Sequence, residues 1–221
     1  MNPVDLRLYG ILDPERAGGR DPVDLVRKAV AGGATLIQYR DKHGEGRRLV
    51  DLARALKAAL DGTGVPLLIN DRVDVALAAG ADGVHLGQDD MHPGDARVLL
   101  GPGAIIGLTL KTAEQADEMA GMPVDYGCIG GVFATASKNN PALPIGLDGL
   151  RRILPHARRA ARGPVGAIAG IDASNARAVM ETGVDGIAVI SALFMADDPQ
   201  TEALRLRGIV DRSLASRGGP A

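Results

Sequence analysis

The sequence predicts an α/β fold, a single (β/α)8 TIM barrel over residues 1–221, from three observations. A chain of 221 residues suits one β/α barrel of roughly 200–250 residues better than two average domains. Short Val/Ile/Leu-rich runs alternate eight times with helical stretches, which favours a parallel sheet closed into a barrel. No linker-like segment interrupts the alternation. We therefore expect one domain, with a frayed tail at about residues 215–221.

Eight short apolar runs are the expected strands, at residues 6–12, 35–40, 66–69, 83–86, 104–108, 124–129, 165–168 and 186–190. The expected helices cover about residues 22–32, 45–60, 73–79, 93–100, 113–120, 147–161, 173–182, 192–195 and 199–214. Asp21 before Pro22 is typical of a helix start, with a side-chain cap and proline at the first helical position. An open doubly wound sheet is the alternative, and it is disfavoured because no Gly-x-Gly-x-x-Gly follows the first strand.

Three segments echo one another: AGGATLI, AAGADGVHL and ETGVDGIAV. Each places a helix end, a glycine and then a strand. We interpret the echo as turn chemistry shared by every barrel unit, because the same helix-to-strand connection recurs.

Composition excludes several classes of protein. The net charge is −2, aromatic residues make up 2% and Trp is absent, which argues against a nucleic-acid binder. The sequence has no run of 18 apolar residues, so it predicts no membrane span. Its N-terminus lacks the basic-then-apolar order of a secretory signal. A single Cys excludes an internal disulfide and predicts a reducing, cytoplasmic location. Self-association into a homo-oligomer stays open.

Cationic side chains follow the second expected strand. Gln38, Arg40 and Lys42 alternate along the chain and therefore share one face. Two cations aimed at one place indicate an anionic partner such as a phosphate or pyrophosphate. The alternative is a solvated strand end, since exposed cations often hold no ligand.

Carboxylates follow the third and fourth strands. Asn70 and Asp71 end one strand, and Asp89 and Asp90 follow the next. Oxygen ligands without a Cys or His cluster suit Mg²⁺, which keeps waters and bridges phosphate oxygens. Asp71 could equally cap the following helix, and Asp89 and Asp90 could form a turn.

Later loops complete the prediction of two anion sites, one near Arg40, Lys42 and Lys138 and one near Gly170 and Ser191. The long loop at residues 130–146 carries Thr135, Ser137 and Lys138, which could surround an anion with hydroxyls, backbone N–H groups and a charge. A long loop without a ligand is the alternative. Gly170 and Ser191 follow the seventh and eighth strands, where barrels often bind phosphate beside a short helix.

Other chemistry-bearing residues have simpler interpretations. Cys128 lies within a strand and is expected to be a buried small hydrophobe. His85 is expected to pack and to form hydrogen bonds, and His43 and His156 to lie at the surface. An arginine cluster is expected to be a solvated helix face, made of Arg151, Arg152, Arg158, Arg159 and Arg162.

Ordered motifs make the sequence resemble the thiamine-phosphate synthase family of β/α barrels. The segment Ile69-Asn70-Asp71-Arg72-Val73-Asp74 is followed by Ala81-Asp82-Gly83-Val84-His85-Leu86-Gly87-Gln88-Asp89-Asp90. Gln38-x-Arg40-x-Lys42 lies upstream and Thr135-x-Ser137-Lys138 downstream. Each motif alone is weak, but their co-occurrence in order is specific and covers about residues 6–196. Ala169-Gly170 stands where many members have Gly-Gly, and Thr109 where many have Ser.

The resemblance implies a Mg²⁺-dependent transferase that joins hydroxymethylpyrimidine diphosphate to hydroxyethylthiazole phosphate and releases pyrophosphate. It implies that Asp71 and Asp90 bind Mg²⁺. Residues matching those that hold the pyrimidine and its diphosphate are Gln38, Arg40, Lys42, Asn70 and Lys138, of which Arg40, Lys42 and Lys138 are the implied catalytic residues. Residues implied near the pyrophosphate and the thiazole phosphate are Thr109, Thr135, Ser137, Gly170, Ile190 and Ser191.

Two rival functions remain on sequence grounds. A thiazole tautomerase of the same barrel type would need a base that titrates near neutral pH. Lys111 occupies the relevant strand end, and an ordinary lysine with a pKa of about 10.4 is a poor base. A non-catalytic binder of thiamine precursors is the second rival, and the retained Asp71, Asp90 and Lys138 argue against it.

Overall fold

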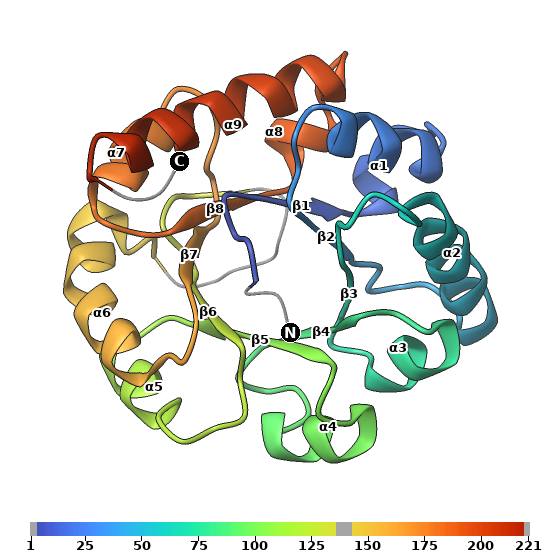
Figure 1. The fold of residues 1–221 in the computed structure, drawn as a ribbon, viewed down its shortest axis with the longest axis horizontal. Coiled ribbons are helices and arrows are strands. Elements are labelled where there is room, and N and C mark those ends of the chain that lie inside the picture. The colour runs from blue at the N-terminus through green and yellow to red at the C-terminus, as the bar shows by residue number, and fades with distance from the viewer. Residues whose placement is uncertain (1–3, 136–142, 219–221) are drawn as a thin grey trace.

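The computed structural model describes residues 4–135 and 143–218, and within them eight parallel strands close into a barrel (Figure 1). The strands follow chain order around the barrel, and β1 pairs with β8 to close it. Their bounds are β1 Leu8–Leu12, β2 Leu36–Tyr39, β3 Leu67–Asn70, β4 Gly83–Leu86, β5 Ile105–Leu110, β6 Tyr126–Ile129, β7 Val165–Ile168 and β8 Gly186–Val189. The predicted (β/α)8 barrel is therefore confirmed.

Helices surround the barrel as an outer ring (Figure 1). Their bounds are α1 Pro22–Ala31, α2 Gly46–Ala59, α3 Val73–Ala79, α4 Pro93–Leu100, α5 Ala113–Glu118, α6 Gly146–Ala160, α7 Ala176–Glu181, α8 Ser191–Phe194 and α9 Pro199–Ala215. None of the helices in the described ranges combines the length and apolar character that a bilayer span requires.

Most predicted boundaries agree with the structure within one or two residues, and the differences have local causes. Asp21 caps α1 as expected, accepting the Val23 N–H at 3.0 Å. Helix α7 starts three residues late because Asp172 Oδ1 accepts the Ser174 N–H at 2.8 Å and holds a turn there. Helix α9 continues through Ala215, the first residue of the tail expected to fray.

Two apolar cores flank the strands. The larger one lies between barrel and helices and includes Leu8, Ile37 and Val84. The smaller one fills the barrel and includes Leu36 and Leu68. Because successive side chains of a strand point to opposite faces, most strands contribute apolar side chains to both cores, whereas β4 contributes Val84 and Leu86 to the larger core alone.

The sequence echo has a structural basis at the N-terminal ends of the strands. The side chain of the residue just before each even-numbered strand accepts a hydrogen bond from a backbone N–H near the start of the preceding strand. The backbone N–H of the accepting residue donates in return to the carbonyl of the residue whose N–H it accepts. The four acceptors and donors are Thr35 with Leu8 at 3.1 Å, Asp82 with Leu67 at 2.7 Å, Asp125 with Ile106 at 2.7 Å and Asp185 with Val165 at 2.8 Å. The return bonds measure 2.8–2.9 Å.

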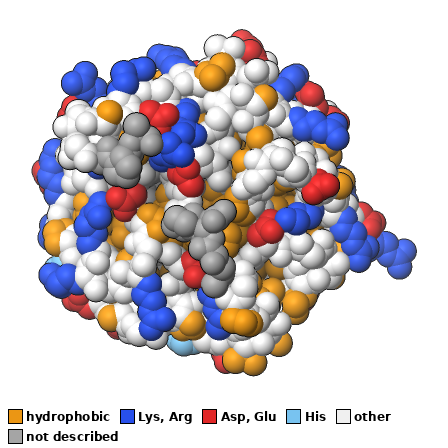
Figure 2. All heavy atoms as spheres, viewed as in Figure 1, with side chains coloured by type: hydrophobic (Ala, Val, Ile, Leu, Met, Phe, Trp, Pro, Cys, Tyr) orange, Lys and Arg blue, Asp and Glu red, His pale blue; other side chains and the backbone are white. Residues whose placement is uncertain are grey.

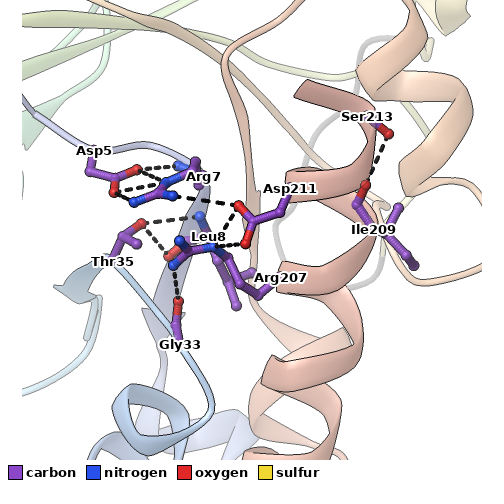
Figure 3. Close-up of polar contacts among 9 residues, drawn as sticks. All are labelled: Asp5, Arg7, Leu8, Gly33, Thr35, Arg207, Ile209, Asp211 and Ser213. Carbon is purple, nitrogen blue, oxygen red and sulfur yellow. Dashed lines mark hydrogen bonds and ion pairs between the residues drawn. The ribbon is translucent and has the colours of Figure 1, made fainter. Parts of the chain in front are cut away.

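Each of the three aspartates also binds a cation from a helix. Lys57, Arg97 and Arg158 bind Asp82, Asp125 and Asp185 respectively. At the first strand, Asp211 of α9 joins Arg7 to Arg207, whose guanidinium donates to the Gly33 carbonyl at 3.0 Å (Figure 3). These contacts fix the N-terminal ends of the strands to the helical ring.

The surface carries charges of both signs. Figure 2 shows Lys and Arg side chains interleaved with Asp and Glu on the face in view. The predicted arginine cluster is solvent-exposed, as expected. One of its members, Arg158, additionally binds Asp185 at 2.8 Å.

We predict that Asp125→Ala lowers the free energy of unfolding by about 2 kcal/mol, because it leaves the Ile106 N–H without its acceptor and leaves Arg97 with backbone carbonyls but no carboxylate partner. Urea denaturation measures the change. Asp51→Ala, at an exposed position on α2, is the control and should stay within about 0.5 kcal/mol of the parent. Equal losses in both variants would contradict this role for Asp125.

Candidate functional site

Barrel closure gathers the predicted site residues at the C-terminal ends of the strands. Gln38 lies on β2, Asn70 ends β3, and Thr109 lies near the end of β5. Arg40 and Lys42 follow β2 directly. Ser137 and Lys138 lie outside the described residues, so their predicted roles stay predictions.

Arg40 is fixed by an aspartate that the sequence analysis missed. Asp13 directly follows β1 and is only 3% exposed. Its Oδ1 accepts the Glu15 N–H at 3.1 Å, which starts a short 3-10 helix, η1 (Pro14–Arg16). Its Oδ2 accepts a bond from Arg40 Nη1. A buried carboxylate thus holds one guanidinium edge and sets the direction of Arg40 at the rim.

Lys42 and two carboxylates form a charged cluster across β2, β3 and β4. Lys42 Nζ donates to Asp71 Oδ2, and the Asp71 and Asp90 carboxyls lie in hydrogen-bonding contact. Asp90 Oδ2 also accepts the Gly87 N–H at 2.7 Å. Burial, followed by the contact with Asp90, raises the pKa of Asp71, while Lys42 opposes the rise.

The backbone of Asp71 shows that it does not cap a helix. Its φ is 59°, a left-handed conformation that few non-glycine residues adopt. The N-cap of α3 is Arg72, without a side-chain cap bond. The capping alternative for Asp71 is therefore wrong, and the strained backbone instead aims the carboxylate at Asp90 and Lys42.

The Asp71–Asp90 pair fits a magnesium ion. Two carboxylates in contact repel each other when both are ionised, and a divalent cation relieves that repulsion. Among residues 4–135 and 143–218, no group of three or more Cys, His, Asp or Glu could hold a metal. Mg²⁺ commonly binds through one or two carboxylates together with substrate phosphates and waters, so two carboxylates suffice.

A hollow of about 700 Å³, open to solvent, lies at the same end of the barrel, at the ends of β5 to β8. Five predicted site residues line it together: Thr109, Thr135, Gly170, Ile190 and Ser191. Lys111 also lines it, and its N–H donates to Gln115 Oε1 at 2.7 Å. Thr112 caps α5 as predicted, accepting the Gln115 N–H at 3.2 Å.

The backbone at the end of β7 is strained where it borders the hollow. Ala169 has a φ of 95°, and its carbonyl accepts the Phe133 N–H at 3.0 Å. Gly170 has a φ of 63°, and a Cβ there would meet the Ala134 carbonyl oxygen at 2.5 Å. The loops after β6 and β7 therefore approach closely, and only glycine fits at residue 170.

Three residues with simpler expectations lie as predicted. His85 is buried, with Nδ1 2.7 Å from Tyr126 Oη and Nε2 2.7 Å from Thr109 Oγ1. Cys128 is buried, and burial raises the pKa of its thiol to about 12, which excludes a reactive thiolate. His43 is exposed. His156, which was also expected at the surface, is instead partly buried and pairs with Asp117 at 2.9 Å.

Taken together, these features define a β/α-barrel enzyme that handles anionic substrates at the C-terminal ends of its strands. A model of the thiamine monophosphate synthase family matches residues 8–193. A thiamine-phosphate synthase of Agrobacterium fabrum is 50% identical over 220 residues, which are 98% of this chain and 99% of that protein. The chain belongs to the thiamine monophosphate synthase family, and it is a transferase of thiamine biosynthesis.

Solved structures agree with this assignment. The thiamine phosphate pyrophosphorylase of Pyrococcus furiosus superposes with a TM-score of 0.83 at 40% identity, covering 96% of this chain and 98% of that one. A 3-hexulose-6-phosphate synthase superposes with a TM-score of 0.64 at 18% identity, covering 92% of this chain and 99% of that one. The second similarity shows the barrel fold alone.

We predict that Ala169→Gly raises the free energy of unfolding by about 1 kcal/mol, because glycine relieves the positive φ of this residue. Urea denaturation measures the change. Ala78→Gly, on the exposed face of α3, is the matched control and should lower the same quantity by about 1 kcal/mol. Destabilisation by both variants would contradict strain at Ala169.

Proposed function

We propose that the chain condenses hydroxymethylpyrimidine diphosphate with hydroxyethylthiazole phosphate, releasing thiamine phosphate and pyrophosphate. The observation that carries this proposal is the pairing of two anion-binding regions at one rim. Arg40, Lys42, Asp71 and Asp90 form one region, and the hollow bordered by Gly170 and Ser191 forms the other. One substrate carries a diphosphate and the other a phosphate, so each has a region suited to its charge.

In this proposal the diphosphate lies against the β2–β4 rim. Arg40, held on one edge by Asp13, presents the rest of its guanidinium to phosphate oxygens. Lys42 moves from Asp71 toward the leaving pyrophosphate as negative charge develops there. Asp71 and Asp90 would hold Mg²⁺, which when bound supplies charge neutralisation for the pyrophosphate.

The carbon–oxygen bond to pyrophosphate breaks first and leaves a resonance-stabilised pyrimidine-methyl cation. The thiazole nitrogen then donates its electron pair to that carbon. The phosphate of the thiazole would lie by Gly170 and Ser191, which directs the ring from the β7–β8 side toward the β2–β4 rim. No protein nucleophile takes part. A cytoplasmic location and a homo-oligomeric state remain predictions.

One specific observation bears on the tautomerase alternative, namely that Lys111 lines the hollow. An ammonium group there suits an anionic substituent better than it suits proton abstraction. Supplying the less stable thiazole carboxylate phosphate tautomer alone, with NMR detection, tests the alternative. Fast isomerisation that Lys111→Ala abolishes would favour the tautomerase.

The direct test is pyrophosphate release from the two purified substrates with Mg²⁺. The wild-type chain should release one pyrophosphate per thiamine phosphate formed. Asp71→Asn should lower the rate by at least about a hundredfold, yet leave the metal-free protein as stable as the parent or more so. Asparagine tolerates the positive φ and carries no charge beside Asp90. Retained turnover with loss of stability would show a structural role for Asp71.

The pH dependence should report the Asp71–Asp90 contact. The raised pKa of Asp71 means that its ionisation opposes folding at neutral pH, and this cost disappears as the pH falls through that pKa. Protons then compete with Mg²⁺, so the Mg²⁺ concentration for half-maximal rate should rise on acidification.

Asp90→Asn removes the neighbouring charge, which lowers the pKa of Asp71. The pH below which the Mg²⁺ requirement rises should therefore move to a lower value. The same variant should raise the Mg²⁺ requirement by about tenfold at neutral pH. Asp89→Asn, at the exposed neighbouring position, is the control and should match the parent. If the pH below which the Mg²⁺ requirement rises were the same in Asp90→Asn as in the parent, a Mg²⁺ site shared by Asp71 and Asp90 would be contradicted.

A further inference from the structure

Helix α8, a single turn that borders the hollow, is held in place by contacts from outside itself. It has four residues, and the first of them, Ser191, lines the hollow. Its own backbone bonds run from the Phe194 N–H to the Ile190 carbonyl at 2.9 Å and from the Met195 N–H to the Ser191 carbonyl at 3.0 Å. One turn is too short to be stable through such bonds alone. The rest of the barrel must therefore set its position.

Strand β1 supports the buried side of α8. Leu193 and Phe194 are fully buried, and both approach Gly10 in the middle of β1. A Cβ at residue 10 would lie 3.1 Å from Leu193 Cδ2 and 3.2 Å from Phe194 Cζ. The glycine lets α8 lie close against the strand, because a larger residue would press on both side chains.

Arg20, in the segment between η1 and α1, binds the far end of α8. Its Nη2 donates to the Phe194 carbonyl, and its Nη1 donates to the Ala196 carbonyl at 2.7 Å. Its Nε donates to the Ala17 carbonyl at 3.0 Å, which fixes the guanidinium within its own segment. The last carbonyls of a helix lack partners inside the helix and carry partial negative charge, so a guanidinium suits them. Arg20 thus ties α8 to the segment that follows β1.

Asn175 holds the opposite wall of the hollow. Its Nδ2 donates to the Gly170 carbonyl at 2.9 Å, and its Oδ1 accepts the Asp172 N–H at 3.0 Å. One side-chain amide therefore bridges the turn after β7, in which Ala169 and Gly170 both have a positive φ. Such a backbone persists only where surrounding contacts hold it. The Asn175 amide supplies two of those contacts.

We propose that Arg20 and Asn175 are positioning residues that set the separation between Ser191 and Gly170, and with it the affinity of the hollow for a phosphate group. Neither is among the described residues that line the hollow, so each acts through the backbone that it holds. The proposal rests on the proposed function for the identity of the ligand, the thiazole phosphate. Loss of either contact should weaken binding of that phosphate and leave bond breaking at the β2–β4 rim unaffected.

Steady-state kinetics separates this role from general destabilisation. Arg20→Ala should raise the KM for the thiazole phosphate by about tenfold, because a loosened α8 no longer holds Ser191 in place. The kcat and the KM for the pyrimidine diphosphate should stay within about twofold of the parent values, since the lost interaction concerns binding of one substrate alone. Asn175→Ala should give the same pattern from the opposite wall.

Two variants are matched controls for these measurements. Arg27→Ala removes an exposed cation from α1 and changes the net charge as Arg20→Ala does. Ser174→Ala removes a hydroxyl that donates to Asp172 in the turn after β7, and it leaves both Asn175 bonds in place. Both controls should keep the parent KM for the thiazole phosphate.

Hydrogen exchange gives a readout that needs no turnover. In the ligand-free protein, the backbone amides of Phe194 and Met195 close the turn of α8. They should exchange faster in Arg20→Ala than in the parent, because the helix has lost the contact that holds its end. Asn175→Ala acts on the other wall and should leave their exchange unchanged.

Parent-like KM values for the thiazole phosphate in folded Arg20→Ala and Asn175→Ala proteins would overturn the proposal, and so would equal increases in the KM of both substrates. If Arg20→Ala does not fold, Arg20→Lys takes its place. Lysine keeps the charge but lacks the planar fork that binds two carbonyls, so the same KM alone should rise.

Absence of pyrophosphate release by the wild-type chain would contradict the proposed function. Equilibrium binding of the thiazole phosphate alone, measured by calorimetry, would then decide the role of Arg20 and Asn175. Binding about tenfold weaker in either variant would support the proposal, and unchanged binding would overturn it.

Discussion

Closure of the sheet by the pairing of β1 with β8 is the constraint on which the site depends. The strands have four to six residues each, so every strand ends at nearly the same height. A side chain that follows one strand therefore meets side chains that follow its neighbours. Arg40 meets Asp13 across 27 residues of sequence, and Lys42 meets Asp71 across 29. A site built from separate short loops needs no further scaffold.

The two ends of the barrel use carboxylates in opposite ways. At the N-terminal end, Asp82, Asp125 and Asp185 each accept a strand N–H and bind a cation, so these charges are matched within the protein. At the C-terminal end, Asp71 lies against Asp90 with a positive φ and a raised pKa. The first arrangement stabilises the fold. The second stores repulsion that a bound divalent cation would relieve, as expected where stability is given up for binding.

The sequence was sufficient to predict the features that depend on local pattern. Eight alternating units and the caps at Asp21 and Thr112 follow from periodicity and residue type, and closed topology follows from the count of units. The rim residues Arg40, Lys42 and Asp90 were found because polar residues after a strand must lie at that end.

The polar side chains that meet inside the barrel could not be predicted in the same way; the hydrogen bonds there join Gln38, Tyr9, Tyr126, His85 and Thr109 in that order. Tyr9 and Tyr126 each look like ordinary apolar-face residues of a strand, and nothing local indicates that they meet across 117 residues. Gly107 gives the only local hint, since glycine inside a strand often permits a close approach. Asp13 was missed for a different reason. It follows β1 as Asp71 follows β3, so the rule that found the other rim residues would also have found it.

The hydrogen-bonded groups inside the barrel also support the part of the proposed function that gives the bond-breaking step to the charged rim. The thiol of Cys128 is too weakly acidic to react, the tyrosines stay protonated, and both ring nitrogens of His85 are engaged in hydrogen bonds. A barrel interior of mutually hydrogen-bonded groups can hold a ring in place but offers little to break a bond. In the proposed function, departure of pyrophosphate needs only positive charge where the negative charge develops. In that proposal the positive charge comes from Arg40, Lys42 and the cation that Asp71 and Asp90 would hold, so orientation and bond breaking belong to different layers of the same barrel.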